Sequence, residues 1–388
     1  MTYISPKIYR LALCIVLLLN SAHVNAQISV IQNLIGKFES YKNFSYQSIN
    51  KRKDMSVDTT VAFNKELFLK APDDKQFGYY YSIETDHKTE TFHRIDLYNG
   101  DGINVLSPSD TSFFPDKESV AYNQSLIGGL MFLKSYYSTR PFPIKMLQDT
   151  VINGVTNTHI VANLSDTIDN NEHLYSRSEF YIDKQTGLPT LVTGKSRYKF
   201  SASGPVNDYY DETKYFNYKV NEPDVTLADF TVPNTFHPRK KQPVQPPLLT
   251  SGTIAPDWTL YDVSGNRVSL SQMKGKVVML DFYFIGCSGC MASINPLNTI
   301  YEKYKNKDVI IASLTERDGK KAVTAFEKTY KIKYPGYIGA ADVVKAYHVG
   351  AFPTFYLIDK EGNIASVIDY NDDFEQKVTA TIDKLLSK

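Results

Sequence analysis

Residues 274–290 read KGKVVMLDFYFIGCSGC. The apolar run Val277–Phe284 within them predicts a buried β-strand. Two cysteines, Cys287 and Cys290, follow almost at once and are separated by two residues. Apolar residues then recur at helical spacing from Ile294 onward. The cysteine pair is therefore expected at the junction between a strand and a helix.

A cysteine pair at the start of a helix favours thiol chemistry. The unpaired N–H groups and the dipole of a helix N-terminus stabilise a thiolate, and Cys-x-x-Cys motifs lower the pKa of the first thiol from about 8.5 to between roughly 3.5 and 7. We expect Cys287 to be an exposed nucleophile and Cys290 to resolve the mixed disulfide. An inert stabilising disulfide and half of a zinc site are the alternatives. No second cysteine pair exists and the next histidine downstream is His348, which disfavours zinc.

The segments after this junction predict an α/β domain over residues 250–388. The expected elements are a strand at Asp308–Leu314, a helix around Phe326, strands at Thr354–Ile358 and Ile364–Tyr370, and a last helix from about Phe374. Strand–helix alternation followed by a hairpin and a helix predicts a central sheet covered on both faces.

Several motifs in this domain resemble the TlpA/ResA-like branch of the thioredoxin superfamily, a group of extracytoplasmic thiol-disulfide oxidoreductases. They are GTIAPDW at 252–258, GNRVSL at 265–270, the stretch that ends in the cysteine pair, YHVGAFPTF at 347–355 and LIDKEG at 357–362. The resemblance implies a thioredoxin-like fold and disulfide exchange through the cysteine pair. We expect no metal ion and no cofactor other than this redox-active pair.

The resemblance assigns a docking edge beside the cysteine pair. Pro353 is expected to follow a cis peptide bond and to face the dithiol. The backbone of Phe352 would then be aimed at the site, where it can pair with a substrate chain as an added strand. The remaining expected substrate contacts are Gly286, Ser288 and Gly289, which lie next to the cysteines in sequence.

An acidic residue, Asp281, lies six residues before Cys287, at the place of the buried acid of many thioredoxins. Burial would raise the pKa of this carboxyl, which could then accept the Cys290 proton while the mixed disulfide is resolved. The alternative is an aspartate at the strand end that turns to solvent.

Two departures from the family pattern lie beside the sulfur atoms. The family usually has Trp before the first cysteine and often Pro before the second, whereas this chain has Gly286 and Gly289. We expect the loss of the aromatic side chain to leave the first thiol more exposed. Peroxidase chemistry is disfavoured, because the Thr and Pro that a peroxiredoxin needs before its reactive cysteine are replaced by Phe284 and Leu280.

The first 26 residues have the layout of a secretory signal peptide. A basic start precedes the apolar run Leu11–Leu19, and Val24–Ala26 is a small-residue cleavage pattern. The run is shorter than the roughly 20 residues that span a bilayer, and Leu13 before Cys14 does not fit a lipoprotein signal. We expect export to the periplasm or cell envelope. Cys14 would be lost on cleavage.

The composition predicts two domains and excludes some functions. The 388 residues carry 43 basic and 42 acidic side chains, a net charge of +1, which gives no general attraction to nucleic acid. Three cysteines are too few for a disulfide scaffold. Five prolines between residues 233 and 247 predict an exposed linker at 233–249, between domains at 27–232 and 250–388.

Residues 27–232 predict a β-rich α+β domain. The expected strands are Thr59–Leu69, Phe77–Ile83, Thr91–Tyr98, Arg177–Ile182, Pro189–Phe200 and Lys214–Val220, with helices at Ile28–Tyr41 and Gln124–Tyr137. This order resembles the half-barrel of LolA-like lipoprotein carriers, a curved antiparallel sheet around helices, on the pieces YKNFS at 41–45, YNG at 98–100 and FYIDKQTGLP at 180–189. The sequence allows a groove in this domain that binds a lipid or a polypeptide.

The sequence as a whole predicts an exported disulfide reductase of the cell envelope. Its substrate would be a disulfide-containing protein, and a membrane or envelope electron donor would recharge the cysteine pair. The alternative is a lipid- or polypeptide-binding envelope protein in which the thioredoxin-like domain is an accessory.

Overall fold

The structure of the protein, a computed structural model, describes residues 28–53, 59–87, 92–202, 204–240 and 245–387. The expected signal peptide, residues 1–26, lies outside these described residues. The chain forms two compact units, and the main boundary between them lies near residue 241. Among the described residues, no helix combines the length and the apolar character needed to cross a membrane.

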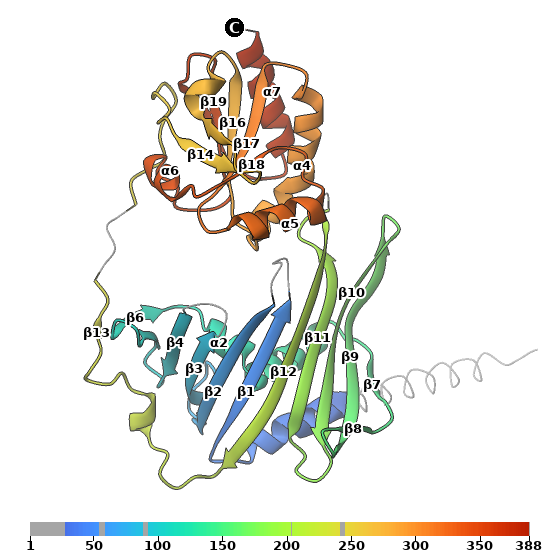
Figure 1. The fold of residues 1–388 in the computed structure, drawn as a ribbon. Coiled ribbons are helices and arrows are strands. Elements are labelled where there is room, and N and C mark those ends of the chain that lie inside the picture. The colour runs from blue at the N-terminus through green and yellow to red at the C-terminus, as the bar shows by residue number, and fades with distance from the viewer. Residues whose placement is uncertain (1–27, 54–58, 88–91, 203, 241–244, 388) are drawn as a thin grey trace, which may run out of the picture. The chain divides into compact units, whose positions relative to one another are not determined.

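The N-terminal unit is built on one 13-stranded sheet (Figure 1). Its strands are β1 Asn43–Lys53, β2 Thr60–Lys70, β3 Tyr79–His87, β4 Phe92–Tyr98, β5 Ile103–Ser107, β6 Ser112–Asp116, β7 Ile144–Met146, β8 Thr150–Ile152, β9 Val155–Asp169, β10 Glu172–Asp183, β11 Pro189–Lys199, β12 Val206–Val220 and β13 His237–Pro238. The spatial order is β13-β6-β5-β4-β3-β2-β1-β12-β11-β10-β9-β7, with β8 beside β9. The sheet is open, with β13 and β7 at its ends, so it does not close into a barrel. Strand β13 lies inside the segment expected to be a linker.

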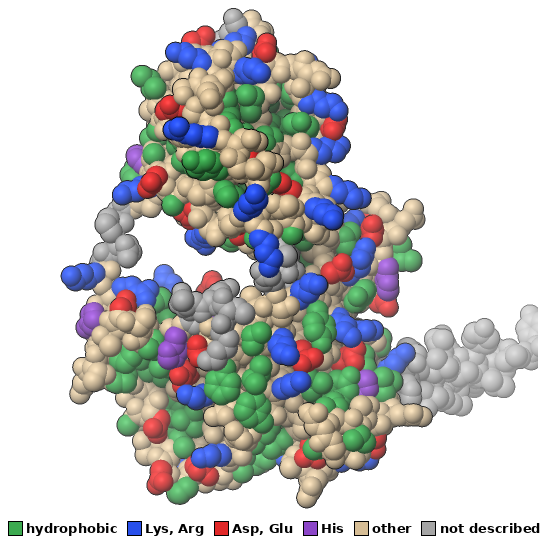
Figure 2. All heavy atoms as spheres, in the orientation of Figure 1, with side chains coloured by type: hydrophobic (Ala, Val, Ile, Leu, Met, Phe, Trp, Pro, Cys, Tyr) green, Lys and Arg blue, Asp and Glu red, His purple; other side chains and the backbone are tan. Residues whose placement is uncertain are grey.

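Helices cover one face of this sheet: residues 28–39, α2 (Val120–Gln124) and α3 (Leu126–Thr139), with a short 3₁₀ turn η1 (Leu227–Phe230) farther along the chain. Their apolar side chains pack on aromatic strand residues to form the core of the unit. Its fully buried members include Ile31, Phe38, Phe44, Phe68, Tyr81, Ile127 and Leu130. The β-rich α+β class is therefore confirmed, whereas β1, β5–β9 and β13 were not predicted from the sequence. On the face shown in Figure 2, basic and acidic side chains of this unit are interspersed with apolar ones.

A close contact between α2 and α3 yields a testable prediction. A Cβ added to Gly128 would lie 1.9 Å from the Tyr122 carbonyl oxygen, whereas one added to the neighbouring Gly129 would meet no atom within 4 Å. We expect Gly128→Ala to lower the unfolding free energy of this unit by about 1–3 kcal/mol, as overpacking does. The matched Gly129→Ala should raise it by up to about 1 kcal/mol, because alanine favours a helix. Urea unfolding followed by circular dichroism tests both, and equal effects would contradict the packing.

The C-terminal unit has a seven-stranded sheet with the order β15-β14-β18-β17-β16-β19-β20. Its strands are β14 Thr259–Asp262, β15 Arg267–Ser269, β16 Val277–Phe282, β17 Val309–Thr315, β18 Gly336–Ile338, β19 Thr354–Ile358 and β20 Ile364–Ile368. Its helices are η2 Leu270–Met273, α4 Ser288–Tyr304, α5 Lys320–Tyr330, α6 Ala341–Ala346 and α7 Phe374–Leu386. Strands β16, β17 and β18 are parallel, and β19 and β20 continue the sheet antiparallel. This is the α/β, thioredoxin-like arrangement that the sequence predicted.

Alternation along β16 assigns its residues to the two faces of this sheet. Val277 and Met279 pack with residues of α4 and α7, whereas Val278, Leu280 and Phe282 pack in a second core on the other face. Because side chains alternate along a strand, Asp281 belongs to the face that α4 covers. The strand therefore places the acid on the same face as the helix that carries the cysteines.

Candidate active site

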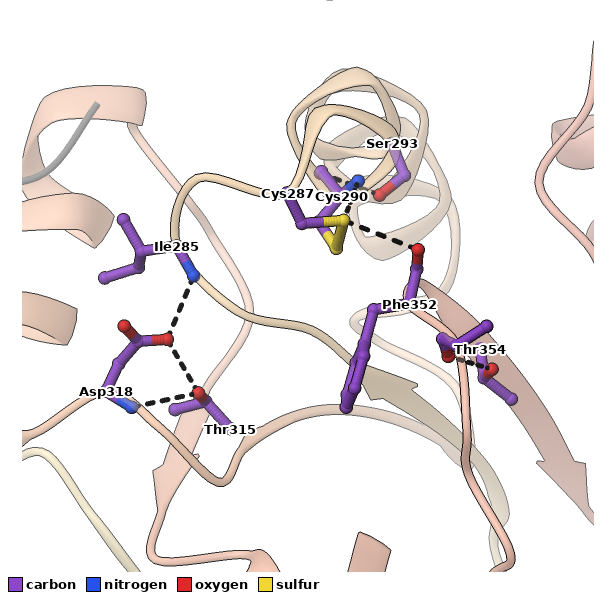
Figure 3. Close-up of a disulfide and its surroundings, with 9 residues drawn as sticks. Ile285, Cys287, Cys290, Ser293, Thr315, Asp318, Phe352 and Thr354 are labelled. Carbon is purple, nitrogen blue, oxygen red and sulfur yellow. Dashed lines mark hydrogen bonds between the residues drawn. A yellow bond between two sulfur atoms is a disulfide. The ribbon is translucent and has the colours of Figure 1, made fainter. Parts of the chain in front are cut away.

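The two cysteines form a disulfide at the start of α4 (Figure 3). Their Cα atoms are 5.2 Å apart. Cys287 is the N-cap residue of α4, and its Sγ accepts a hydrogen bond of 3.2 Å from the backbone N–H of Cys290. The helix terminus thus directs a backbone N–H group at the first sulfur, where it would stabilise a thiolate.

The first cysteine is less exposed than the sequence predicted. Cys287 has only 8% of its surface exposed, and the half-buried side chains of Phe284 and Phe352 pack against the same cluster. The centres of their rings are 5.3 Å apart in an edge-to-face contact, so two aromatic side chains border this cluster although Trp is missing. Gly286 has φ of +96°, a conformation that glycine adopts without strain and tryptophan does not.

The expected docking edge lies beside the disulfide. The peptide bond between Phe352 and Pro353 is cis, as predicted. The Phe352 carbonyl oxygen lies 3.5 Å from Cys287 Sγ and points toward it in Figure 3. Gly289 lies so close to the proline that an added Cβ would be 2.8 Å from Pro353 Cδ. Glycine at position 289 thus allows the start of α4 to approach the proline ring.

Asp281 is buried and does not turn to solvent. Only 3% of its surface is exposed, and its Oδ2 accepts a hydrogen bond of 2.6 Å from the hydroxyl of Ser313. Burial raises the pKa of the Asp281 carboxyl to about 7, although the Ser313 hydroxyl lowers it in part. Asp281 and Cys290 line the same small cavity. A carboxyl with this pKa can both accept and release a proton near neutral pH.

Sequence reasoning missed two residues that shape the site. Asp318 accepts hydrogen bonds from the Ile285 N–H (2.9 Å) and the Thr315 hydroxyl (2.7 Å), which holds the loop before Cys287 (Figure 3). The exposed Arg317 places its guanidinium carbon 4.7 Å from the centre of the Phe284 ring. Both residues follow β17, the parallel neighbour of β16. Functional sites of α/β sheets lie at the carboxyl ends of such strands. The position of these two residues directly after β17 was therefore the signal that could have revealed them.

Among the described residues, no group of three or more His, Cys, Asp or Glu side chains is arranged to hold a metal ion. The site consists of a disulfide, a buried acid that shares a cavity with Cys290 and a cis-proline edge beside the disulfide. This set of groups can exchange disulfides through the sulfur atoms alone.

The AhpC/TSA family model matches residues 251–367. The thiol-disulfide oxidoreductase ResA of Bacillus cereus is 36% identical over 118 residues, which are 30% of this chain and 68% of that protein. The chain belongs to the ResA-like family of thiol-disulfide oxidoreductases. ResA of Bacillus subtilis is 32% identical over 121 residues, which are 31% of this chain and 68% of that protein. The thioredoxin domain of a Bacteroides vulgatus thiol-disulfide oxidoreductase is 30% identical, covers 34% of this chain and 99% of that chain, and has a TM-score of 0.33.

The C-terminal unit is thus a ResA-like thiol-disulfide oxidoreductase, an enzyme class whose substrates contain disulfides. The family model does not reach the N-terminal unit. The resemblance of that unit to LolA-like carriers therefore stays a prediction.

The contact between Gly289 and Pro353 can be tested in the ResA-like unit. Gly289→Ala forces a methyl group against the proline ring, so we expect about 1–3 kcal/mol of destabilisation and slower disulfide exchange. The matched control is Gly319→Ala, whose added Cβ would meet no atom within 4 Å. The rate of insulin reduction by dithiothreitol measures exchange. If both variants reduce insulin at the wild-type rate, the contact does not position the dithiol.

The pKa of Asp281 predicts how the stability of the ResA-like unit depends on pH. A carboxyl whose pKa rises from 3.8 to about 7 on folding keeps its proton in the folded state and loses it in the unfolded state. The unfolding free energy therefore falls as the pH rises from about 4 to about 7. Asp281→Asn removes this titration, so the variant should gain stability over the wild type across that window, by up to about 4 kcal/mol.

Unfolding of the oxidised full chain measures this difference, because the disulfide keeps both cysteines from titrating. Trp258 is the single tryptophan of the chain and is buried in the C-terminal unit. Its fluorescence therefore follows that unit alone during urea unfolding. Parallel pH profiles of the wild type and Asp281→Asn would contradict the raised pKa.

Proposed function

We propose that the protein is an exported disulfide reductase that acts in the periplasm or cell envelope. The observation that carries this proposal is the Cys287–Cys290 disulfide at a helix start, with the Phe352 carbonyl and the cis-proline beside it. The pattern of the first 26 residues supports export. The redox group would be the cysteine pair itself, without a further cofactor.

The proposed reaction starts from the reduced dithiol. The Cys287 thiolate attacks one sulfur of a substrate disulfide, which forms a mixed disulfide and releases the other substrate sulfur as a thiolate. Cys290 gives its proton to Asp281 and attacks Cys287 Sγ. The second substrate thiolate leaves and takes a proton from water. The substrate gains two electrons, and the enzyme is left as the disulfide that the structure contains.

Contacts for a disulfide-containing protein substrate would come from the surface around Cys287. The backbone of Phe352 can pair with an extended substrate segment, and Gly286, Ser288 and Gly289 surround the sulfurs. The aromatic pair and Arg317 extend this surface on one side. A membrane or envelope electron donor would then reduce Cys287–Cys290 again and so set the net direction.

The N-terminal unit would supply a second binding function, for a lipid or a polypeptide. A polypeptide is the better fit, because the apolar interior of the unit is already filled by its own helices. A cavity in the unit is lined mainly by polar side chains, among them Asn50, Asn64 and Thr213. Glu66 at the same cavity is buried, which raises its pKa to about 8 and keeps it neutral at pH 7. Amide and hydroxyl groups suit a peptide better than an acyl chain.

The roles of the two cysteines predict opposite outcomes for their variants. In Cys287→Ser the nucleophile is absent, so insulin reduction should fall to the uncatalysed rate. Cys290→Ser should still attack but cannot resolve, and should accumulate mixed disulfides that a reducing agent releases. The measurements are insulin turbidity and non-reducing electrophoresis of the full chain, followed by identification of the trapped proteins. Equal insulin reduction by the wild type and Cys287→Ser would instead favour the binding function alone.

A further inference from the structure

Three neighbouring strands place Asp281, Ser313 and Gly336 in one row on the face that α4 covers. Asp281 of β16 is the register partner of Ser313 of β17, and Ser313 is in turn the partner of Gly336 of β18. The Ser313 hydroxyl donates to Asp281. The row therefore runs from a buried acid, through a hydroxyl group, to a position without a side chain.

The carboxylate of Glu327 fills the space that Gly336 leaves. A Cβ on Gly336 would lie 2.5 Å from Glu327 Oε1, and the Gly336 N–H donates a hydrogen bond to this carboxylate. Glu327 comes from α5 and is half-buried, in contrast to Asp281 with 3% of its surface exposed. It is therefore the acid of the pair that reaches solvent.

One cavity connects these groups to the second cysteine. Its lining includes Cys290, Asp281, Ser313, Glu327 and Gly336. The space open to the centre of a water molecule is about 10 Å³, close to the requirement of a single water. Asp281 Oδ1 is buried without a hydrogen-bond partner in the described part of the chain. A water in this cavity would give that oxygen a partner.

We propose that Glu327 is the outer group of a proton path between Asp281 and solvent, formed across the gap at Gly336. The proposal rests on the reductase function proposed above. When Cys290 attacks, its proton moves to the Asp281 carboxylate; it then passes through the cavity to the Glu327 carboxylate and leaves to bulk water. No electrons move along the path. Glu327 acts through Asp281 and does not touch the sulfur atoms.

The surroundings of Glu327 raise the pKa of its carboxyl above the ordinary value of a glutamate. Burial raises the pKa of Glu327, the Gly336 N–H lowers it in part, and the nearby Asp262 raises it further. The other titratable groups on the cavity are Asp281, Cys290, Tyr283 and Tyr334, and burial keeps both tyrosines protonated. The pKa of Glu327 thus moves toward that of Asp281, which makes proton transfer between the two acids easier.

A single turnover with Ellman's reagent tests the path in the full chain. One equivalent added to reduced protein releases one coloured thiolate when Cys287 attacks and a second when Cys290 resolves. Below the Asp281 pKa of about 7, most molecules carry a protonated Asp281. That carboxyl must lose its proton before it can accept the proton of Cys290, so resolution waits for this loss. The wild type should resolve in one phase. In Glu327→Gln, the molecules with a protonated Asp281 should resolve their mixed disulfide in a second phase, slower by about tenfold or more.

Added formate separates a proton path from a structural effect, because a small acid can replace the missing carboxylate. Formate should accelerate the slow phase of Glu327→Gln and leave the wild type unchanged. Gly336→Ala displaces the carboxylate without a change of charge and should also show the slow phase. Glu302→Gln makes the same substitution at a surface ion pair and should behave as the wild type does.

The outcomes distinguish the path from the proposed function. A wild type that releases no second thiolate would refute the reductase function itself. With an active wild type, a single phase at the wild-type rate in Glu327→Gln would overturn only the path, as would a slower phase that formate does not change. Trp258 fluorescence confirms that each variant is folded.

Discussion

Strand β16 lies between β17 and β19, so both of its edges are hydrogen-bonded and both of its faces are covered. Every residue from Val277 to Phe282 is buried. The register of such a strand against its neighbours is fixed, because a shift of one residue would move every side chain to the opposite face of the sheet. The position of Cys287, where the chain leaves this strand for α4, is fixed by the same constraint.

The two positions next to the sulfur atoms where the family usually has Trp and Pro are glycines in this chain. Gly286 adopts a positive φ, and Gly289 touches the proline ring, so neither position carries a side chain over the disulfide. Two aromatic residues that lie far apart in sequence, Phe284 and Phe352, pack instead against the cluster that contains both cysteines.

Local motifs revealed those parts of the site that each lie within a short stretch of sequence. The cysteine pair, the acid six residues before it and the proline of the FPT segment could be predicted because each has a fixed offset from a motif. Glu327 and Gly336 could not, because they meet Asp281 only through the register of three strands and the packing of α5. The same reason explains the N-terminal unit: its β-rich class followed from composition, but the neighbours β1 and β12 are joined across most of the domain sequence.

Because a buried acid lies beside a reactive thiol, the negative charge is on only one of the two groups at a time. An ionised Asp281 and a Cys290 thiolate would be two like charges beside one small cavity, so having both at once is unfavourable. The site can hold the proton on Cys290 while the acid is ionised, or on Asp281 while the thiolate attacks. Because Asp281 and Cys290 expose only 3% and 4% of their surfaces, bulk water screens the pair only weakly. The proton therefore has to move when the sulfur reacts.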